Sequence, residues 1–133
     1  MRNCINFINL GLHKYERIPT ELIIAQAVLE SNYGKSRFAK EGNNLFGIRT
    51  WNLQEEHIKP FNTNDQTFGV KIFKSKCDCV KYYVKILNNS SAFKDFRKMR
   101  KKMLDNFFCY LGRSIKNYYR LMEEDYKKST SCN

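Results

Sequence analysis

The sequence predicts a mostly helical α+β domain in which one small β element is inserted between helices. Residues 22–29, within an expected helix over 19–32, are apolar except for Gln26, which indicates a buried helix, and residues 80–87 carry apolar side chains at the spacing of an amphipathic helix. Between these helices, residues 68–72 alternate apolar with polar or small side chains, which is typical of a strand. A chain of 133 residues has the length of one domain. We therefore expect a single domain over 1–133, helical over 1–42 and 75–128, with a β part over about 43–74.

The apolar stretch has clear start and stop signals for a helix. Pro19 suits the first turn, Thr20 can cap the amino end and Gly34 can terminate the carboxyl end. Apolar side chains cover nearly every face between these signals: Leu22, Ile23, Ile24, Ala25, Ala27, Val28 and Leu29. Because a helix that is apolar all round is packed on several sides, we expect it at the centre of the helical part.

The segments that follow are shorter and more polar. Residues 42–51, GNNLFGIRTW, are rich in turn formers and aromatics, and we expect Asn43 and Asn44 to satisfy backbone groups in a tight turn. Ser75 and Asp78 resemble a capping box and predict the start of the amphipathic helix. Further helices are expected over about 92–104 and within 105–127.

The chain is strongly basic, with a formal net charge of +11. Such a charge favours polyanionic partners such as nucleic acid, anionic lipid or a bacterial wall. No apolar run approaches the roughly 18 residues of a membrane span. Residues 1–15 are interrupted by asparagines and lack the apolar core of a signal peptide. We therefore expect synthesis in the cytoplasm, either as this chain or as part of a longer one.

Five cysteines occur at irregular spacing: Cys4, Cys77, Cys79, Cys109 and Cys132. The odd count and the lack of a repeating frame argue against a disulfide framework, so we expect simple thiols. Cys77 and Cys79 are two residues apart on an expected helix and point to nearly opposite faces. His13 and His57 have no partner at metal-ligand spacing, so neither a metal nor a cofactor is expected.

One carboxylate, Glu30, stands at the end of the apolar helix. Apolar neighbours and the negative end of the helix dipole both disfavour a charged carboxylate. A carboxyl that stays protonated near neutral pH is what a general acid needs, for example to protonate the leaving oxygen of a glycosidic bond. The alternative is a Glu30 that simply faces solvent, and the spacing by itself slightly favours that alternative.

The residues around Glu30 carry a family resemblance. Residues 18–51, IPTELIIAQAVLESNYGKSRFAKEGNNLFGIRTW, resemble the Bax-like N-acetylglucosaminidases, relatives of the flagellar peptidoglycan hydrolase domain in glycoside hydrolase family 73. The similarity continues more loosely to about residue 100, and Tyr33 stands where the family often has Trp. The positions in register with the family motif are 25–27, 30–31, 34, 36–37, 39 and 42–47.

The resemblance implies a lysozyme-like fold, with a helical lobe around the central apolar helix, a small β lobe and a cleft between them. It implies a peptidoglycan hydrolase that cleaves the β-1,4 bond after N-acetylglucosamine, with Glu30 as the catalytic acid. The family usually places a tyrosine at the cleft, and Tyr110 is the best match here. We expect a monomer that acts on the bacterial wall in the periplasm. Such a chain resembles a phage endolysin released by a partner holin, or a domain of a bacterial autolysin.

A second catalytic group is less well defined. Glycosidases usually use two carboxylates, and Glu55 and Glu56 lie in the β segment, where they could form the opposite lip of the cleft. An exposed acidic loop explains them at least as well. In this family the acetamido group of the substrate is an alternative nucleophile, so that Glu30 and Tyr110 would be sufficient.

Candidate substrate contacts surround the motif. Ser31 follows the catalytic acid directly, and Tyr33, Phe46 and Trp51 are candidates for stacking on sugar faces. Burial of Trp51 beneath the β lobe is an equally good explanation. Arg49 could pair with a carboxylate of the peptide stem.

Three alternatives remain open. A muramidase or a lytic transglycosylase of the same fold would share the Glu-Ser pair and differ in its product. A nucleic-acid-binding module would explain the charge and the aromatic content, although the sequence has no helix-turn-helix, zinc-finger or RNP pattern. A wall-binding domain without catalysis would bind sacculi and release nothing.

Overall fold

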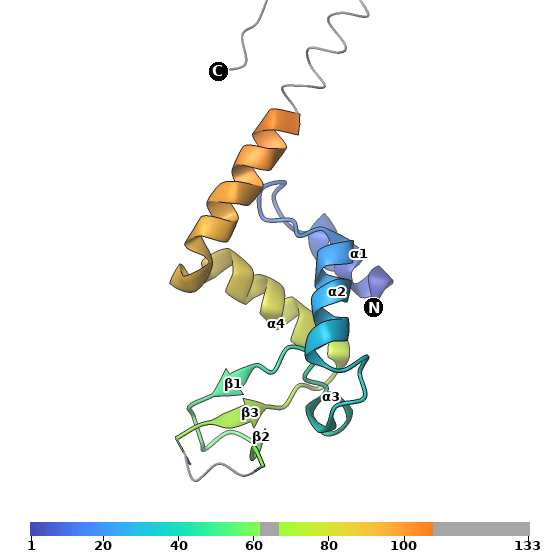
Figure 1. Ribbon diagram of the computed structural model, residues 1–133, viewed down its shortest axis with the longest axis vertical. Helices are drawn as coiled ribbons and strands as arrows, with labels where there is room; N and C mark the ends of the chain where they lie inside the picture. The colour runs from blue at the N-terminus through green and yellow to red at the C-terminus, as the bar shows by residue number, and fades with distance from the viewer. Residues whose placement is uncertain (62–66, 108–133) are drawn as a thin grey trace, which may run out of the picture. The chain divides into compact units, whose positions relative to one another are not determined.

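A computed structural model describes residues 1–61 and 67–107 of the chain (Figure 1). The predicted mostly helical α+β class is confirmed. The chain divides into two compact units, Met1–Ser90 and Ser91–Asn133. In the second unit a 3₁₀ turn, Ser91–Phe93, leads into a helix over 94–107. The elements of the first unit are α1 (Arg2–Leu10), α2 (Thr20–Glu30), α3 (Arg37–Glu41), β1 (Arg49–Thr50), β2 (His57–Ile58), β3 (Gly69–Lys71) and α4 (Lys76–Asn89).

Two polar contacts tie α1 to the start of α2. Pro19 occupies the N-cap position of α2, and Thr20 does not cap the helix as predicted. The Thr20 hydroxyl instead donates a 3.0 Å hydrogen bond to Asn6 Oδ1, because a tertiary acceptor on α1 is within its reach. Arg2 and Glu21 add an ion pair with a nitrogen–oxygen distance of 2.8 Å.

Packing covers only one stripe of α2. Ile23 and Ala27, four residues apart, are buried, whereas Leu29 is 77% exposed. The prediction of a helix covered on all sides is therefore wrong for the described residues, because the neighbouring elements of its unit cover only part of its circumference. Neither α2 nor another helix within 1–61 and 67–107 combines the length and apolarity needed to cross a membrane.

The three short strands form an antiparallel sheet in the order β1-β3-β2, and all three lie within the predicted 43–74 segment. Val70 in β3 is paired with Arg49 on one side and Ile58 on the other. Val70 and Ile58 are buried, so the sheet has one covered face.

α4 begins at the predicted capping pair. The Ser75 hydroxyl accepts a 3.1 Å hydrogen bond from the Asp78 backbone N–H and donates to the Asp78 carboxylate at 2.7 Å. Val80, Val84 and Leu87 are buried, which confirms the predicted apolar face of this helix.

Cys4 on α1 and Cys77 on α4 form a disulfide, with Cα atoms 5.9 Å apart. The prediction of simple thiols is wrong for this pair, because packing of α1 on α4 joins residues 73 positions apart, which no local spacing reveals. Cys79 is a buried free thiol on the other side of the helix, as predicted. Cys109 and Cys132 lie outside the described residues.

Candidate functional site

Glu30 is the last residue of α2, and its side chain is exposed. The apolar surroundings expected for it are not present among the described residues. Ile23, Ala27 and Ser31 form a buried stripe that continues past the helix end, and Glu30 lies outside this stripe. The carboxyl group of Glu30 is therefore accessible from solvent, as the alternative interpretation of its position suggested.

The turn after Glu30 has an unusual backbone. Asn32, Tyr33 and Gly34 have φ angles of 50°, 58° and 75°, in the left-handed region that residues with side chains rarely adopt. Three such residues in succession end the helix abruptly, because the chain cannot continue in the right-handed conformation.

Ser31 holds this turn from inside. Its side chain is buried, and its hydroxyl donates to the Ala27 carbonyl and accepts a 2.7 Å hydrogen bond from the Gly34 N–H. The structure thus places Ser31 in the framework of the turn and not on the surface, where a substrate contact was predicted. These two bonds fix the backbone of the turn that follows Glu30.

A tyrosine from α4 reaches α2 one turn before Glu30. The Tyr83 hydroxyl donates a 2.8 Å hydrogen bond to Oε1 of Gln26, which precedes Glu30 by four residues and so lies on the same side of α2. Burial raises the pKa of Tyr83, the nearby Glu30 carboxylate raises it further, and the hydrogen bond to Gln26 opposes both. The phenol is therefore neutral near neutral pH.

Phe46 packs flat against Tyr83, with ring centroids 4.0 Å apart and ring planes at 12°. One face of the Phe46 ring, which was predicted to stack on a sugar, is thus covered by Tyr83. The two rings form an aromatic wall next to Gln26.

Buried polar groups fix the turn that presents this ring. The Asn44 side-chain amide donates to the carbonyl oxygens of Ile48 and Lys71 at 2.9 and 2.8 Å, and its oxygen accepts from the Ile48 N–H at 3.0 Å. The Leu45 N–H donates to Sγ of Cys79 at 3.4 Å. The prediction that Asn44 satisfies backbone groups is confirmed, and the turn is attached to both β3 and α4.

The other predicted contact residues are exposed. Tyr33, in the turn after α2, is 74% exposed, and Trp51, directly after β1, is 68% exposed. Burial of Trp51 beneath the sheet, the alternative to a sugar contact, is therefore wrong. Arg49 is also exposed, and its guanidinium carbon lies 4.4 Å from the centroid of the Phe68 ring.

The two candidates for a second carboxylate differ in their surroundings. Glu55 accepts a 2.6 Å hydrogen bond from Lys71 Nζ, and this bond and the charge of Lys71 lower the pKa of Glu55. Glu56 is exposed. A carboxylate that Lys71 keeps ionised is a poor proton donor, but this does not exclude Glu55 as the second group, which acts in its charged form. The predicted catalytic role of either residue stays a prediction.

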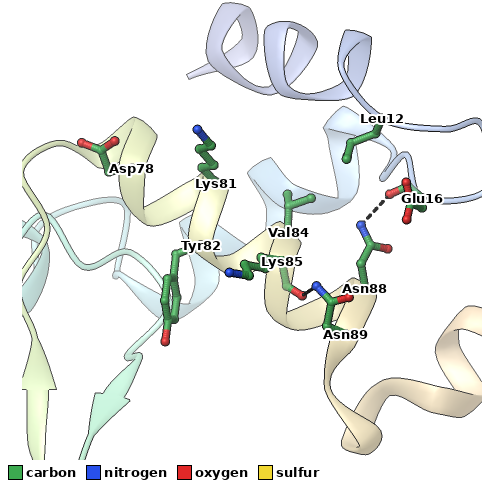
Figure 2. A pocket seen from close by; sticks show the side chains of 9 residues that line it. All are labelled: Leu12, Glu16, Asp78, Lys81, Tyr82, Val84, Lys85, Asn88 and Asn89. Atoms are coloured by element: carbon green, nitrogen blue, oxygen red, sulfur yellow. Dashed lines mark hydrogen bonds between the residues drawn. The ribbon is translucent and has the colours of Figure 1, made fainter. Parts of the chain in front are cut away.

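A groove of about 350 Å³ lies elsewhere in the Met1–Ser90 unit, between the segment after α1 and α4 (Figure 2). The Asn88 side-chain amide donates to the Glu16 carbonyl at 2.9 Å at one end of it. No residue of the Glu30 site lines this groove, so its volume does not identify the chemistry. Its lining residues are Leu12, Glu16, Asp78, Lys81, Tyr82, Val84, Lys85, Asn88 and Asn89.

Tyr110 lies outside the described residues. Within 1–61 and 67–107, no group of three or more His, Cys, Asp and Glu side chains is placed to hold a metal ion.

Sequence reasoning missed Gln26 and Tyr83 as members of the site. The four-residue spacing between Gln26 and Glu30 is a signal that could have identified Gln26. Tyr83 follows Val80 by three residues and so belongs to the apolar face of α4, and no local pattern indicates that its hydroxyl reaches α2.

Comparisons with known proteins agree with the motif around Glu30. The glucosaminidase family model, described as mannosyl-glycoprotein endo-beta-N-acetylglucosaminidase, matches residues 10–131. The chain is similar to protein bax of Escherichia coli strain K12, with 32% identity over 95 residues, 71% of this chain and 33% of that protein. The chain therefore spans about a third of the length of this relative. No solved structure gives a significant match.

Proposed function

Because the chain belongs to the glucosaminidase family, we propose that it is a glycoside hydrolase that cleaves peptidoglycan at the β-1,4 bond after N-acetylglucosamine. Glu30 is the general acid in this proposal. The observation that carries it is the position of Glu30, exposed at the end of α2 and four residues after Gln26, whose side chain accepts the hydrogen bond from Tyr83.

Accessibility supports this role for Glu30. Cleavage of a glycosidic bond needs a proton on the leaving oxygen, and a glycan strand can reach a carboxyl group that is exposed at a helix end. Glu30 also stands at the negative end of the α2 dipole, and the last turn of α2 contains no basic residue. The buried Ser31 hydroxyl fixes the backbone of the turn that follows the acid.

The substrate supplies the second group in this proposal. Neither the ion pair of Glu55 with Lys71 nor the exposure of Glu56 excludes a carboxylate in this role. We assign the nucleophile to the acetamido group of N-acetylglucosamine because the substrate carries it next to the bond that is cleaved, one of the exceptions to the two-carboxylate mechanism. The net charge of +11 would attract the enzyme to an anionic wall.

Digestion of purified Gram-negative peptidoglycan tests the proposal, with the reduced fragments identified by mass spectrometry. Glu30→Gln removes the acid, and Glu21→Gln, at the other end of α2, is the matched control. Fragments ending in reduced N-acetylglucosamine, released by the wild type and Glu21→Gln but not by Glu30→Gln, are the expected result.

The other outcomes are equally informative. Reducing N-acetylmuramic acid, or its anhydro form, would overturn the proposed bond and indicate a muramidase or a lytic transglycosylase. No fragments from any of the three proteins would overturn the hydrolase itself and favour a binding module. Activity that survives Glu30→Gln would overturn the assignment of the acid.

A further inference from the structure

We propose that Tyr83, held by Gln26, is a positioning residue for Glu30. The proposal rests on the proposed function, because it assigns a supporting partner to the acid of that same site. It is carried by the hydrogen bond between α4 and α2 and by the helical spacing of Gln26 and Glu30.

Helix geometry brings the Tyr83 hydroxyl to the side of α2 that carries Glu30. Residues four positions apart are displaced by about 6 Å along a helix and point to the same side. Gln26 and Glu30 have this spacing, and the Tyr83 hydroxyl lies 2.8 Å from Oε1 of Gln26. The electrostatic effect of Glu30 on Tyr83 agrees with this placement.

The Tyr83 ring has little freedom to move. It stacks on Phe46, and it projects from a stretch of α4 in which Val80 and Val84 are buried. The turn of Phe46 is in turn fixed by the buried Asn44. A hydroxyl held by ring packing and one hydrogen bond is a fixed polar point in the site.

The direction of the hydrogen bond leaves the phenol oxygen free to act as an acceptor. Tyr83 donates its only proton to Gln26, and a phenol can accept as well as donate. A protonated carboxyl is a donor, so the acidic form of Glu30 is a suitable partner for this oxygen. Such a bond would orient the Glu30 carboxyl group until the leaving oxygen of the substrate takes the carboxyl proton. Tyr83 itself would exchange no proton with the substrate.

Tyr83→Phe and Tyr82→Phe form a matched pair of variants. Each removes one hydroxyl and keeps the ring, from neighbouring residues of α4. Tyr82 is partly exposed, contacts Phe73 at 5.6 Å between ring centroids and lines the groove of Figure 2, away from the Glu30 site. Differences between the variants therefore report on the position of the hydroxyl.

The test measures kcat and KM on soluble, peptide-free glycan strands for these variants, with melting temperatures alongside. Tyr83→Phe is expected to lower kcat roughly tenfold to a hundredfold and to leave KM within about twofold, since orientation and not binding is lost. Tyr82→Phe should match the wild type. A second variant, Gln26→Met, removes the acceptor, and its effect combined with Tyr83→Phe should be no larger than that of Tyr83→Phe alone.

Each outcome decides between the proposals. If the wild type is active and both tyrosine variants keep its kcat, the positioning role is overturned and the proposed function stands. The positioning role is also overturned if activity falls only in proportion to a lower melting temperature. The same holds if the effects of Gln26→Met and Tyr83→Phe simply add. A wild type that releases no fragments overturns the proposed function and this inference with it.

Discussion

The disulfide between Cys4 and Cys77 joins α1 to the first turn of α4 and links two residues that are 73 positions apart in the sequence. A cross-link of this kind restricts the unfolded chain and so raises the free energy of unfolding. We predict that replacing both cysteines by serine lowers that free energy by about 2–4 kcal/mol, measured by urea denaturation.

Reductant provides the control for this disulfide prediction. It should lower the urea midpoint of the wild-type protein towards that of the double variant and leave the double variant itself unchanged. A wild-type midpoint that reductant does not move would contradict the prediction.

Asn44 offers a prediction about the turn below Phe46. Asn44→Asp keeps the shape of the side chain but replaces its N–H donors by an oxygen that faces the carbonyl oxygens of Ile48 and Lys71. Because these groups are buried, we expect the free energy of unfolding to fall by at least about 2 kcal/mol. Urea denaturation at neutral pH measures the change.

An exposed asparagine serves as the control for Asn44. Asn89 donates to the Lys85 carbonyl at 3.0 Å on the surface of α4, so Asn89→Asp should cost less than about 1 kcal/mol. Equal losses for the two variants would show that burial of Asn44 does not determine its contribution.

The features that sequence predicted well depend on neighbours in the chain. Ser75 and Asp78 stand three residues apart and cap α4, and the turn formers around Asn44 satisfy backbone groups. The apolar side chains of α4 repeat at the helical period and are buried. In each case the physical cause acts over a few residues, so a local pattern can show it.

The features that sequence did not predict depend on which elements pack together. The disulfide between Cys4 and Cys77 and the hydrogen bond from Tyr83 to Gln26 form only because α4 packs next to α1 and α2. The exposure of Glu30 and Leu29 depends on which sides of α2 this packing covers. An apolar composition shows that a helix can be buried, but it does not show which sides its neighbours cover.

Ser31→Ala tests whether this serine supports the turn or contacts the substrate. Loss of the hydroxyl leaves the Gly34 N–H without its acceptor, so the free energy of unfolding should fall by about 1–3 kcal/mol. We expect kcat to fall because the turn beside Glu30 relaxes, and KM to remain unchanged. Urea denaturation and steady-state kinetics on soluble glycan strands measure these effects.

Ser36→Ala is the comparison for Ser31. The Ser36 hydroxyl caps α3 by accepting from the Ala39 N–H at 3.2 Å, so this variant should lose about 1 kcal/mol of stability without loss of kcat. A higher KM for Ser31→Ala at unchanged stability would instead support the predicted substrate contact.

The ion pair of Glu55 and Lys71 predicts a pH-dependent contribution to stability. Lys71 lowers the pKa of Glu55 below its ordinary value of 4.5, so the folded protein binds this proton less readily than the unfolded chain. The ion pair therefore adds to the free energy of unfolding above pH 4.5, and this contribution is lost as the pH falls through the lowered pKa.

We expect the difference in the free energy of unfolding between the wild type and Glu55→Gln to be largest near neutral pH, and to disappear in acid and at high salt. Urea denaturation from pH 7 to pH 3 measures it. Glu56→Gln, one residue away and exposed, removes the same charge and leaves the bond between Glu55 and Lys71 in place, so it is the matched control. A Glu55→Gln difference that stays constant over this range would mean that the carboxylate contributes through its shape and not through its charge.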